Sequence, residues 1–178
     1  MRELSLHIMD IAENSVTAGA DLIEITIEEN RNEDYLLILV KDNGSGIDEE
    51  MLKDITDPFV TTRKTRRVGL GLSLFEAACV RCDGYLKVES KKHYGTKITA
   101  FMKYNHIDRA PLGKVEETIL SLLLYDRIDL IYRHIINEKE FIFETKEIKK
   151  IVGEDINSPE ILQWIKEYIS QNINALET

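Results

Sequence analysis

Two short runs of alternating apolar and polar residues near the start of the chain most restrict its possible folds. Residues 22–28 and 35–41 are rich in β-branched and aliphatic side chains, which is typical of strands. The polar residues 30–34 between them predict a turn, so the two runs should pair as a hairpin. Residues 4–16 precede this hairpin with apolar side chains at three- and four-residue steps, the spacing of an amphipathic helix.

The elements that follow extend this arrangement. Asp48 is placed to cap a short helix, residues 57–69 predict an irregular loop, and residues 70–80 predict an apolar helix. Two more strands are expected at residues 85–90 and 96–104. This order of helices and strands predicts the α/β class, as an α+β two-layer sandwich in which helices cover one face of a mixed sheet.

The pattern lapses over residues 105–113, where Pro111 and Gly113 favour a break in regular structure. We therefore divide the chain into a first domain over residues 1–104, a linker, and a small, mostly helical domain over residues 114–178. The small domain should contain helices at 114–125, at 145–152 with Thr145 as cap, and from Pro159 onward with Ser158 as cap, and a hairpin of 129–136 with 140–144. Its apolar stripes predict either packing against the first domain or pairing with a second subunit as a homodimer.

Charge and composition exclude several classes of function. The chain has 178 residues, of which 23 are basic and 32 acidic, so its formal net charge is −9. An acidic protein repels nucleic acid and anionic lipid, and we expect neither as a partner. The first residues lack a signal-peptide pattern, and every apolar run is too short to span a bilayer. We therefore expect a cytoplasmic protein.

The two cysteines, Cys79 and Cys82, form a C-x-x-C pair near the end of the helix expected at residues 70–80. A structural zinc site needs four ligands, and a redox pair needs its first thiol at a helix start. Packing therefore explains the pair best, and a thiol switch or a shared metal is the alternative.

Four short motifs follow one another on these elements. Asp10 and Asn14 are four residues apart and therefore share one face of the first helix. The other three motifs are Asp-Asn-Gly-Ser-Gly at residues 42–46, Gly-Leu-Gly-Leu-Ser at residues 69–73 and Gly-Thr at residues 95–96. Each motif is weak evidence alone, but their order on these elements is specific for a magnesium-bound nucleotide.

Two of the motifs suit the base of such a nucleotide. The carboxylate of Asp42 can accept a hydrogen bond from the amino group of adenine, whereas guanine presents an acceptor at that position. Gly44 and Gly46 would let the backbone pass close under the base, where a Cβ atom would collide. These residues therefore predict selectivity for adenine.

The other groups suit phosphates and metal. Gly69 and Gly71, in one motif with Leu70 and Leu72, would present backbone N–H groups to phosphates at a helix start. The amide oxygen of Asn14 is a hard ligand of the kind that Mg²⁺ accepts. The sequence therefore predicts ATP and Mg²⁺ as ligands.

Longer stretches resemble a known superfamily. Residues 7–20, His-Ile-Met-Asp-Ile-Ala-Glu-Asn-Ser-Val-Thr-Ala-Gly-Ala, resemble the N-box of the mismatch-repair ATPases. Residues 58–62, Pro-Phe-Val-Thr-Thr, and residues 69–74 resemble sensor histidine kinases instead, as do residues 84–90 and the Gly-Thr pair. The resemblance covers roughly residues 4–103 and is to the GHKL superfamily of gyrases, chaperones, histidine kinases and mismatch-repair proteins.

The resemblance implies the Bergerat ATP-binding fold, with Asn14 on Mg²⁺, Asp42 on adenine and Thr96 near the base through a water molecule. Residues 57–68 would be the ATP lid. Within the lid, the basic run that includes Lys64 is a candidate phosphate clamp, with partner docking or simple solvation as alternatives.

The resemblance also bears on Asp10. Hydrolytic and anti-sigma-kinase members carry a glutamate base at this position, and histidine kinases carry no base there. Asp10 is therefore a candidate general base. Hydrogen bonding to the ligands of the metal, or a structural role, is the alternative.

Only a few residues precede the ATP-binding part, which leaves no room for a dimerisation hairpin with a phosphoacceptor histidine. We therefore expect an ATP-binding regulatory protein that phosphorylates or controls a separate protein partner in cytosolic signalling, similar to the anti-sigma serine kinases. The alternatives are an ATP-gated binding module with little phosphotransfer, and a dimerising ATPase clamp of the repair or chaperone type.

Overall fold

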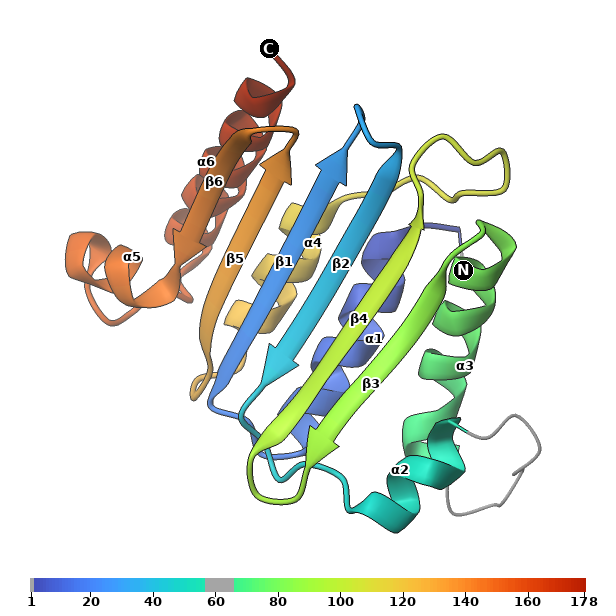
Figure 1. Cartoon of the computed structure of the whole chain (residues 1–178). Helices are drawn as coiled ribbons and strands as arrows, with labels where there is room; N and C mark the ends of the chain where they lie inside the picture. Colours follow the sequence, from blue (N-terminus) through green and yellow to red (C-terminus); the bar gives the residue numbers. More distant parts are fainter. Residues whose placement is uncertain (1, 57–65) are drawn as a thin grey trace.

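The fold is built on one six-stranded sheet whose helices pack against one face (Figure 1). The computed structural model describes residues 2–56 and 66–178, with the backbone alone for residues 56 and 66–70. The strand order is β3-β4-β2-β1-β5-β6, and all neighbours are antiparallel except β1 and β5, which are parallel. The strands are β1 (Leu22–Asn30), β2 (Tyr35–Asp42), β3 (Tyr85–Lys91), β4 (Gly95–Lys103), β5 (Asp129–Ile136) and β6 (Lys139–Glu144).

The helices form the second layer. In Figure 1, α1, α3, α4 and α6 lie behind the sheet, while α2 lies near the lower end of β3 and α5 near the lower end of β6. The predicted two-layer α/β sandwich is therefore confirmed. The helices are α1 (Leu4–Thr17), α2 (Glu49–Thr56), α3 (Arg66–Arg81), α4 (Val115–Leu123), α5 (Thr145–Val152) and α6 (Pro159–Glu177).

The central strand β1 anchors the helical layer. Its residues Ile23, Ile25 and Ile27 are fully buried, and the residues between them are half-buried on the opposite face. Ile8 and Ile11 of α1 are buried in the same core. Burial of each such side chain contributes roughly 1.5–3 kcal/mol. The strand alternation and the helix spacing in the sequence therefore both point to this core, which holds α1 behind the middle of the sheet (Figure 1).

The predicted helices and strands are all present, with two local differences, and most of the loop predicted at residues 57–69 lies outside the described residues. The helix expected from residue 70 begins at Arg66, because glycine lowers helix propensity without preventing a helix. Thr145 does not cap α5, since its hydroxyl accepts from the backbone N–H of Leu130. Ser158 does cap α6 as predicted, because its Oγ accepts from the backbone N–H of Ile161.

The C-terminal part of the chain extends the sheet. Strand β5 pairs in parallel with β1 along eight residue pairs, from Leu22 with Asp129 to Glu29 with Ile136. The apolar stripe of α6 packs into the common core, where Ile165 is fully buried. Packing against the first part is thus what the structure contains, and a homodimer stays a prediction.

The segment predicted as a linker, residues 105–113, is tied to the start of α1. The backbone N–H groups of Leu4 and Ser5 donate to the carbonyls of Pro111 and Leu112, at 3.0 and 2.8 Å. A polar stretch with proline and glycine resembles a linker in sequence, yet here it closes onto the first helix. The division into domains stays a prediction, and its two parts share one sheet.

A buried polar network joins β1 to β5. His134 has no exposed surface, its Nε2 lies 2.7 Å from Oε1 of Glu29, and its Nδ1 lies 2.6 Å from the hydroxyl of Tyr132. Burial opposes ionisation of Glu29, but hydrogen bonds from His134 and Arg31 outweigh it and lower the pKa of Glu29. Because a carboxylate only accepts, Nε2 of His134 carries the proton and Nδ1 accepts from Tyr132.

The network continues to the end of the chain. Arg31 contacts both Glu29, at 3.3 Å, and Glu177 at the end of α6, at 2.6 Å. The arginine thereby connects the β1–β2 turn to the last helix. The C-terminal part is thus held by polar contacts as well as by its apolar stripe.

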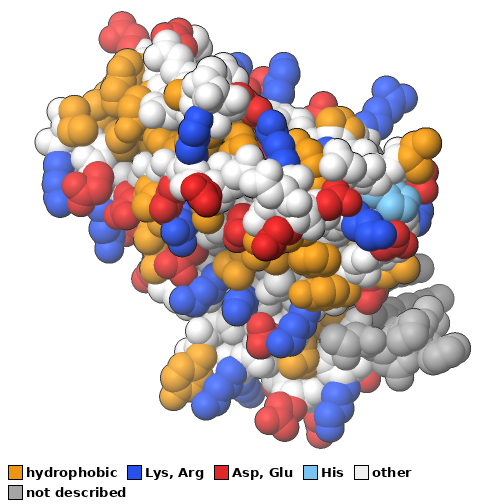
Figure 2. Space-filling model, turned by 45° about the horizontal axis from the view of Figure 1, so that its top comes forward, with side chains coloured by type: hydrophobic (Ala, Val, Ile, Leu, Met, Phe, Trp, Pro, Cys, Tyr) orange, Lys and Arg blue, Asp and Glu red, His pale blue; other side chains and the backbone are white. Residues whose placement is uncertain are grey.

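Charged side chains are interspersed on the surface. Figure 2 shows acidic and basic side chains alternating over one face of the molecule, with apolar side chains between them. Ion pairs of exposed residues include Lys103 with Asp83 at 3.0 Å and Lys41 with Glu24 at 3.1 Å. Such exposed pairs contribute little to stability.

Within the described part of the chain, no helix is both long enough and apolar enough to cross a membrane.

Replacing Tyr132 by phenylalanine tests the buried network. Tyr132→Phe leaves the buried Nδ1 of His134 without a donor, so the free energy of unfolding should fall by about 1–3 kcal/mol. Urea denaturation measures this loss, with Tyr94→Phe as the matched control because Tyr94 is exposed. Equal losses in the two variants would contradict the network.

Candidate functional site

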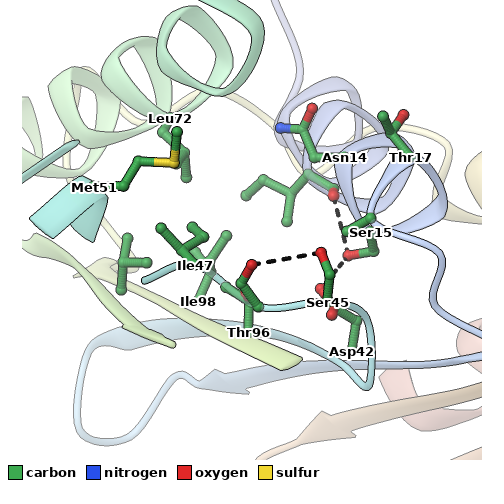
Figure 3. A pocket seen from close by; sticks show the side chains of 14 residues that line it. Asn14, Ser15, Thr17, Asp42, Ser45, Ile47, Met51, Leu72, Thr96 and Ile98 are labelled. Atoms are coloured by element: carbon green, nitrogen blue, oxygen red, sulfur yellow. Dashed lines mark hydrogen bonds between the residues drawn. The ribbon is translucent and has the colours of Figure 1, made fainter. Parts of the chain in front are cut away.

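A cavity of about 240 Å³ opens between α1, the start of α3 and the lower ends of β2, β3 and β4 (Figure 3). It brings together residues from four of the sequence motifs, namely Asn14, Asp42, Gly46, Leu72 and Thr96. Most of the remaining lining is apolar, and it consists of Ile11, Ala18, Ile47, Met51, Val88 and Ile98, together with Ser15, Thr17 and Ser45.

The carboxylate of Asp42 is held in place at the end of β2. Its side chain is 9% exposed, its Oδ2 accepts from Ser15 Oγ at 2.6 Å, and its Oδ1 accepts from the backbone N–H of Gly44 at 2.8 Å. Two donors from separate elements thus fix one acceptor group at the cavity.

Thr96 lies directly opposite Asp42, because the two residues are partners in the antiparallel register of β2 and β4. Thr96 Oγ1 lies 2.8 Å from Ser90 Oγ, and Ser90 Oγ also accepts from the backbone N–H of Ile47. The Gly-Thr motif and the 42–46 motif are therefore brought together by strand pairing and by one serine.

The glycines of the 42–46 turn are required by the protein's own backbone. Gly46 has φ of +68°, and a Cβ atom there would lie 2.1 Å from the carbonyl oxygen of Lys91. A Cβ atom on Gly44 would lie 2.9 Å from the carbonyl oxygen of Ala18. The structure thus supplies a reason for these glycines within the chain itself, and their role in clearing space for a base stays a prediction.

Asp10 and Asn14 lie one turn apart on α1, as predicted. Asn14 lines the cavity (Figure 3), whereas Asp10 lies beside it against α3. A Cβ atom on Gly71 would lie 3.4 Å from Cβ of Asp10 and 3.5 Å from its Oδ2. These are ordinary van der Waals distances, so the contact places Asp10 beside Gly71 of α3 without requiring a glycine there.

The prediction that Gly69 and Gly71 stand at a helix start needs correction. Since α3 begins at Arg66, only its first four N–H groups lack a partner within the helix. Gly69 lies in that first turn and Gly71 lies beyond it. The N–H groups that lack a partner within the helix are therefore those of residues 66–69, slightly earlier than predicted.

The remaining predicted residues divide into two groups. Leu72 lines the cavity and is buried. Leu70 lies in α3, but its side chain is not described, and Lys64 lies outside the described residues. The proposed lid and clamp therefore stay predictions.

Most of the apolar lining and the role of Ser15 were not predicted from the sequence. A signal existed for several of these residues. Ile98 lies two residues after Thr96 on the same face of β4, and Ile11 shares a face of α1 with Asn14 and Ser15. Met51 from α2 had no such signal, because its position depends on how the 42–46 turn directs the chain.

The two cysteines lie away from the cavity lining in the core. Both are buried as free thiols. Burial raises the pKa of Cys79 to about 12 and also raises that of Cys82. Since the thiolate is the reactive and metal-binding form, packing is the role that this environment favours.

The arrangement suits a flat heteroaromatic ring with an amino substituent. An apolar slot with a few fixed polar groups is typical of sites for small ligands. Here the fixed polar group at its end is an ionisable acceptor, Asp42, which would select a ring that donates.

Comparison with known families agrees with this geometry. The family model described as "Histidine kinase-, DNA gyrase B-, and HSP90-like ATPase" matches residues 2–106, which is more than half of the chain. The protein therefore belongs to this family of ATP-binding domains, the GHKL superfamily, and the predicted membership is confirmed.

Sensor kinases are among the similar proteins. Sporulation kinase D of Bacillus subtilis (strain 168) is 34% identical over 92 residues, which are 52% of this chain and 18% of that protein. The tetrathionate sensor histidine kinase TtrS of Salmonella typhimurium is 42% identical over 72 residues, 40% of this chain and 11% of that protein. The chain thus spans less than a fifth of these relatives.

A solved structure shares the fold over a longer stretch. The N-terminal domain of a DNA repair protein superposes with a TM-score of 0.54 and covers 82% of this chain and 53% of that one. The identity is 15%, so this likeness shows the fold alone.

The stability of the protein should depend on pH through His7, which lies on α1 where this helix contacts α3, next to the site. It stacks on Phe75 with ring centroids 4.8 Å apart, and its Nδ1 has no hydrogen-bond partner among the described residues. Burial lowers the pKa of His7 below its ordinary 6.5, and the charge of Arg81 acts in the same direction, although Asp10 opposes it. The folded protein therefore binds a proton at His7 less readily than the unfolded chain does.

The stability that a neutral His7 supports is complete above pH 6.5 and is lost as the pH falls through the lower pKa of the folded state. The free energy of unfolding should therefore fall more steeply with acid in the wild type than in His7→Leu. Urea denaturation between about pH 5 and 8 measures this, and His93→Asn in the exposed β3–β4 turn should follow the wild type. Parallel curves for wild type and His7→Leu would refute it.

Asp42→Asn tests the acceptor. The substitution replaces a charged acceptor with an amide, so ATP binding should weaken by about 1–3 kcal/mol. Isothermal titration calorimetry measures this, and Asp54→Asn on α2, an exposed aspartate, is the matched control. Unchanged affinity in Asp42→Asn would mean that the base is recognised elsewhere.

Proposed function

We propose that this protein binds ATP with Mg²⁺ and uses it to regulate a separate protein in cytosolic signalling, by transferring a phosphoryl group to it. The observation that carries the proposal is that Asp42 and Asn14 line one apolar cavity from different elements (Figure 3). A carboxylate for an amino-purine and an amide oxygen for a metal are the two groups that an ATP–Mg²⁺ site needs from the chain.

The donor set fits Mg²⁺. Among the residues that the structure describes, no three His, Cys, Asp or Glu side chains gather into a metal cluster. Mg²⁺ usually keeps several waters and takes one or two protein ligands together with substrate phosphates. Asn14 alone would therefore suffice as the protein's ligand, and the ion would neutralise phosphate charge when bound.

Asp10 is the candidate base for transfer. It lies one turn before Asn14 on α1 and beside the start of α3. A hydroxyl of the partner protein would attack the γ-phosphorus, the bond from that phosphorus to the bridging oxygen would break, and ADP would leave. Asp10 would take the proton of the attacking hydroxyl.

The relatives' names support a kinase-like role, since they include sporulation kinases and a tetrathionate sensor histidine kinase. The matched stretch is a small share of each of these relatives, 18% of sporulation kinase D and 11% of TtrS, so the partner of this chain is inferred from chemistry and not from them. The basic run at residues 63–67 is offered as a phosphate clamp.

One observation favours a second candidate function. Asp10 packs against Gly71 beside the cavity, so its carboxylate could couple bound ATP to the position of α3 instead of taking a proton. The protein would then be a module whose grip on a partner depends on bound ATP, without transfer.

Asp10→Asn separates the two functions. If Asp10 is the base, transfer of radiolabel from [γ-³²P]ATP to proteins captured from a cell extract should fall about 10²–10⁴-fold, with ATP affinity unchanged. Glu13→Gln, an exposed change on the same helix, should transfer normally. If ATP alters partner capture but no label is ever transferred, phosphotransfer is excluded and the ATP-gated module is supported.

A further inference from the structure

We propose that Ser15 is a positioning residue that holds Asp42 as a pure hydrogen-bond acceptor and so sets the preference for a 6-aminopurine over a 6-oxopurine. The inference deepens the proposed function, since it concerns the specificity of the same site. It rests on the contact between Ser15 Oγ and Asp42 Oδ2, which joins α1 to the end of β2 across 27 residues of sequence.

The hydroxyl of Ser15 has two acceptors and one proton. Oγ lies 2.6 Å from Asp42 Oδ2 and 3.3 Å from the carbonyl oxygen of Ile11. The shorter contact is to the charged acceptor, and charge-assisted hydrogen bonds are both shorter and stronger than neutral ones. The proton therefore belongs to the bond with Asp42.

Comparison with other helical hydroxyls in the chain strengthens this assignment. A serine or threonine in a helix commonly donates to the carbonyl four residues earlier. Thr17 does so to Glu13 at 3.0 Å and Ser121 to Glu117 at 2.9 Å, both at exposed positions. Ser15 is 2% exposed, and its equivalent contact is longer, because the hydroxyl is directed toward Asp42.

The other oxygen of Asp42 is also fixed, by the backbone N–H of Gly44. Each carboxylate oxygen has two acceptor positions, so each keeps one for a ligand after accepting these bonds. Both protein groups donate, and the carboxylate can then only accept. An amino group on the purine satisfies it, whereas a 6-oxo group places two acceptors against each other.

Without Ser15, Oδ2 of Asp42 would lose its hydrogen bond from α1, and the carboxylate could rotate while Oδ1 keeps the bond from the backbone N–H of Gly44. The site would then discriminate less strongly between a 6-amino and a 6-oxo group on the purine. The expected change is in discrimination as well as in affinity, which separates a positioning role from a purely structural one.

The experiment compares ATP with inosine triphosphate, which differs in carrying a 6-oxo group. Isothermal titration calorimetry with Mg²⁺ should give an ATP affinity for Ser15→Ala about 5–30-fold below that of the wild type, the scale of one lost charge-assisted bond. The ratio of ATP to inosine triphosphate affinity should fall about tenfold. Ser15→Cys, with a weaker donor of similar size, should lie between the two.

Ser121→Ala is the matched control, since it removes a helical serine bond away from the cavity and should leave both affinities at wild-type values. Thermal melting before each titration confirms that every variant is folded. ATP binding by Ser15→Ala with an unchanged ratio overturns the positioning role and leaves the proposed function intact. Failure of the wild type to bind ATP would refute the proposed function, and this inference with it.

Discussion

The site depends on the antiparallel pairing of β2 with β4. In this register Asp42 faces Thr96 at the end of the sheet, where α1 also ends. The strands hold this register because one face is buried, and a slip of one residue would turn every core side chain outward. The buried isoleucines of β1 bring α1 to the same place, so packing in the core decides where Asn14 and Ser15 meet the carboxylate.

Much of this could be predicted from the sequence. The sequence shows apolar residues at alternate positions in β1 and β2, and at three- and four-residue steps in α1. These local patterns predict the fold correctly because the apolar side chains in them are the ones that are buried. The residues Asn14, Asp42 and Thr96 were found because each carries a polar group in a motif. That these three residues would lie close together was predicted from the order of the helices and strands, since they are far apart in the sequence.

The rest could not be predicted, for physical reasons. The apolar lining consists of ordinary core residues, and nothing local distinguishes Val88 or Met51 from side chains that never reach a cavity. The close approach of Gly44 to Ala18 and of Gly46 to Lys91 could not be predicted either, because these chain segments lie far away in sequence. Likewise, the start of α3 depends on contacts that helix propensity does not include.

The parallel pairing of β1 with β5 has a consequence for where the ATPase unit ends. The family match stops at residue 106, but β1 lies between β2 and β5, and β5 begins only at Asp129. A fragment cut at the family boundary would leave one side of β1 with unpaired N–H and C=O groups beside fully buried isoleucines. Bare strand edges of this kind are templates for pairing with other chains, and in this structure β5 covers that edge of β1.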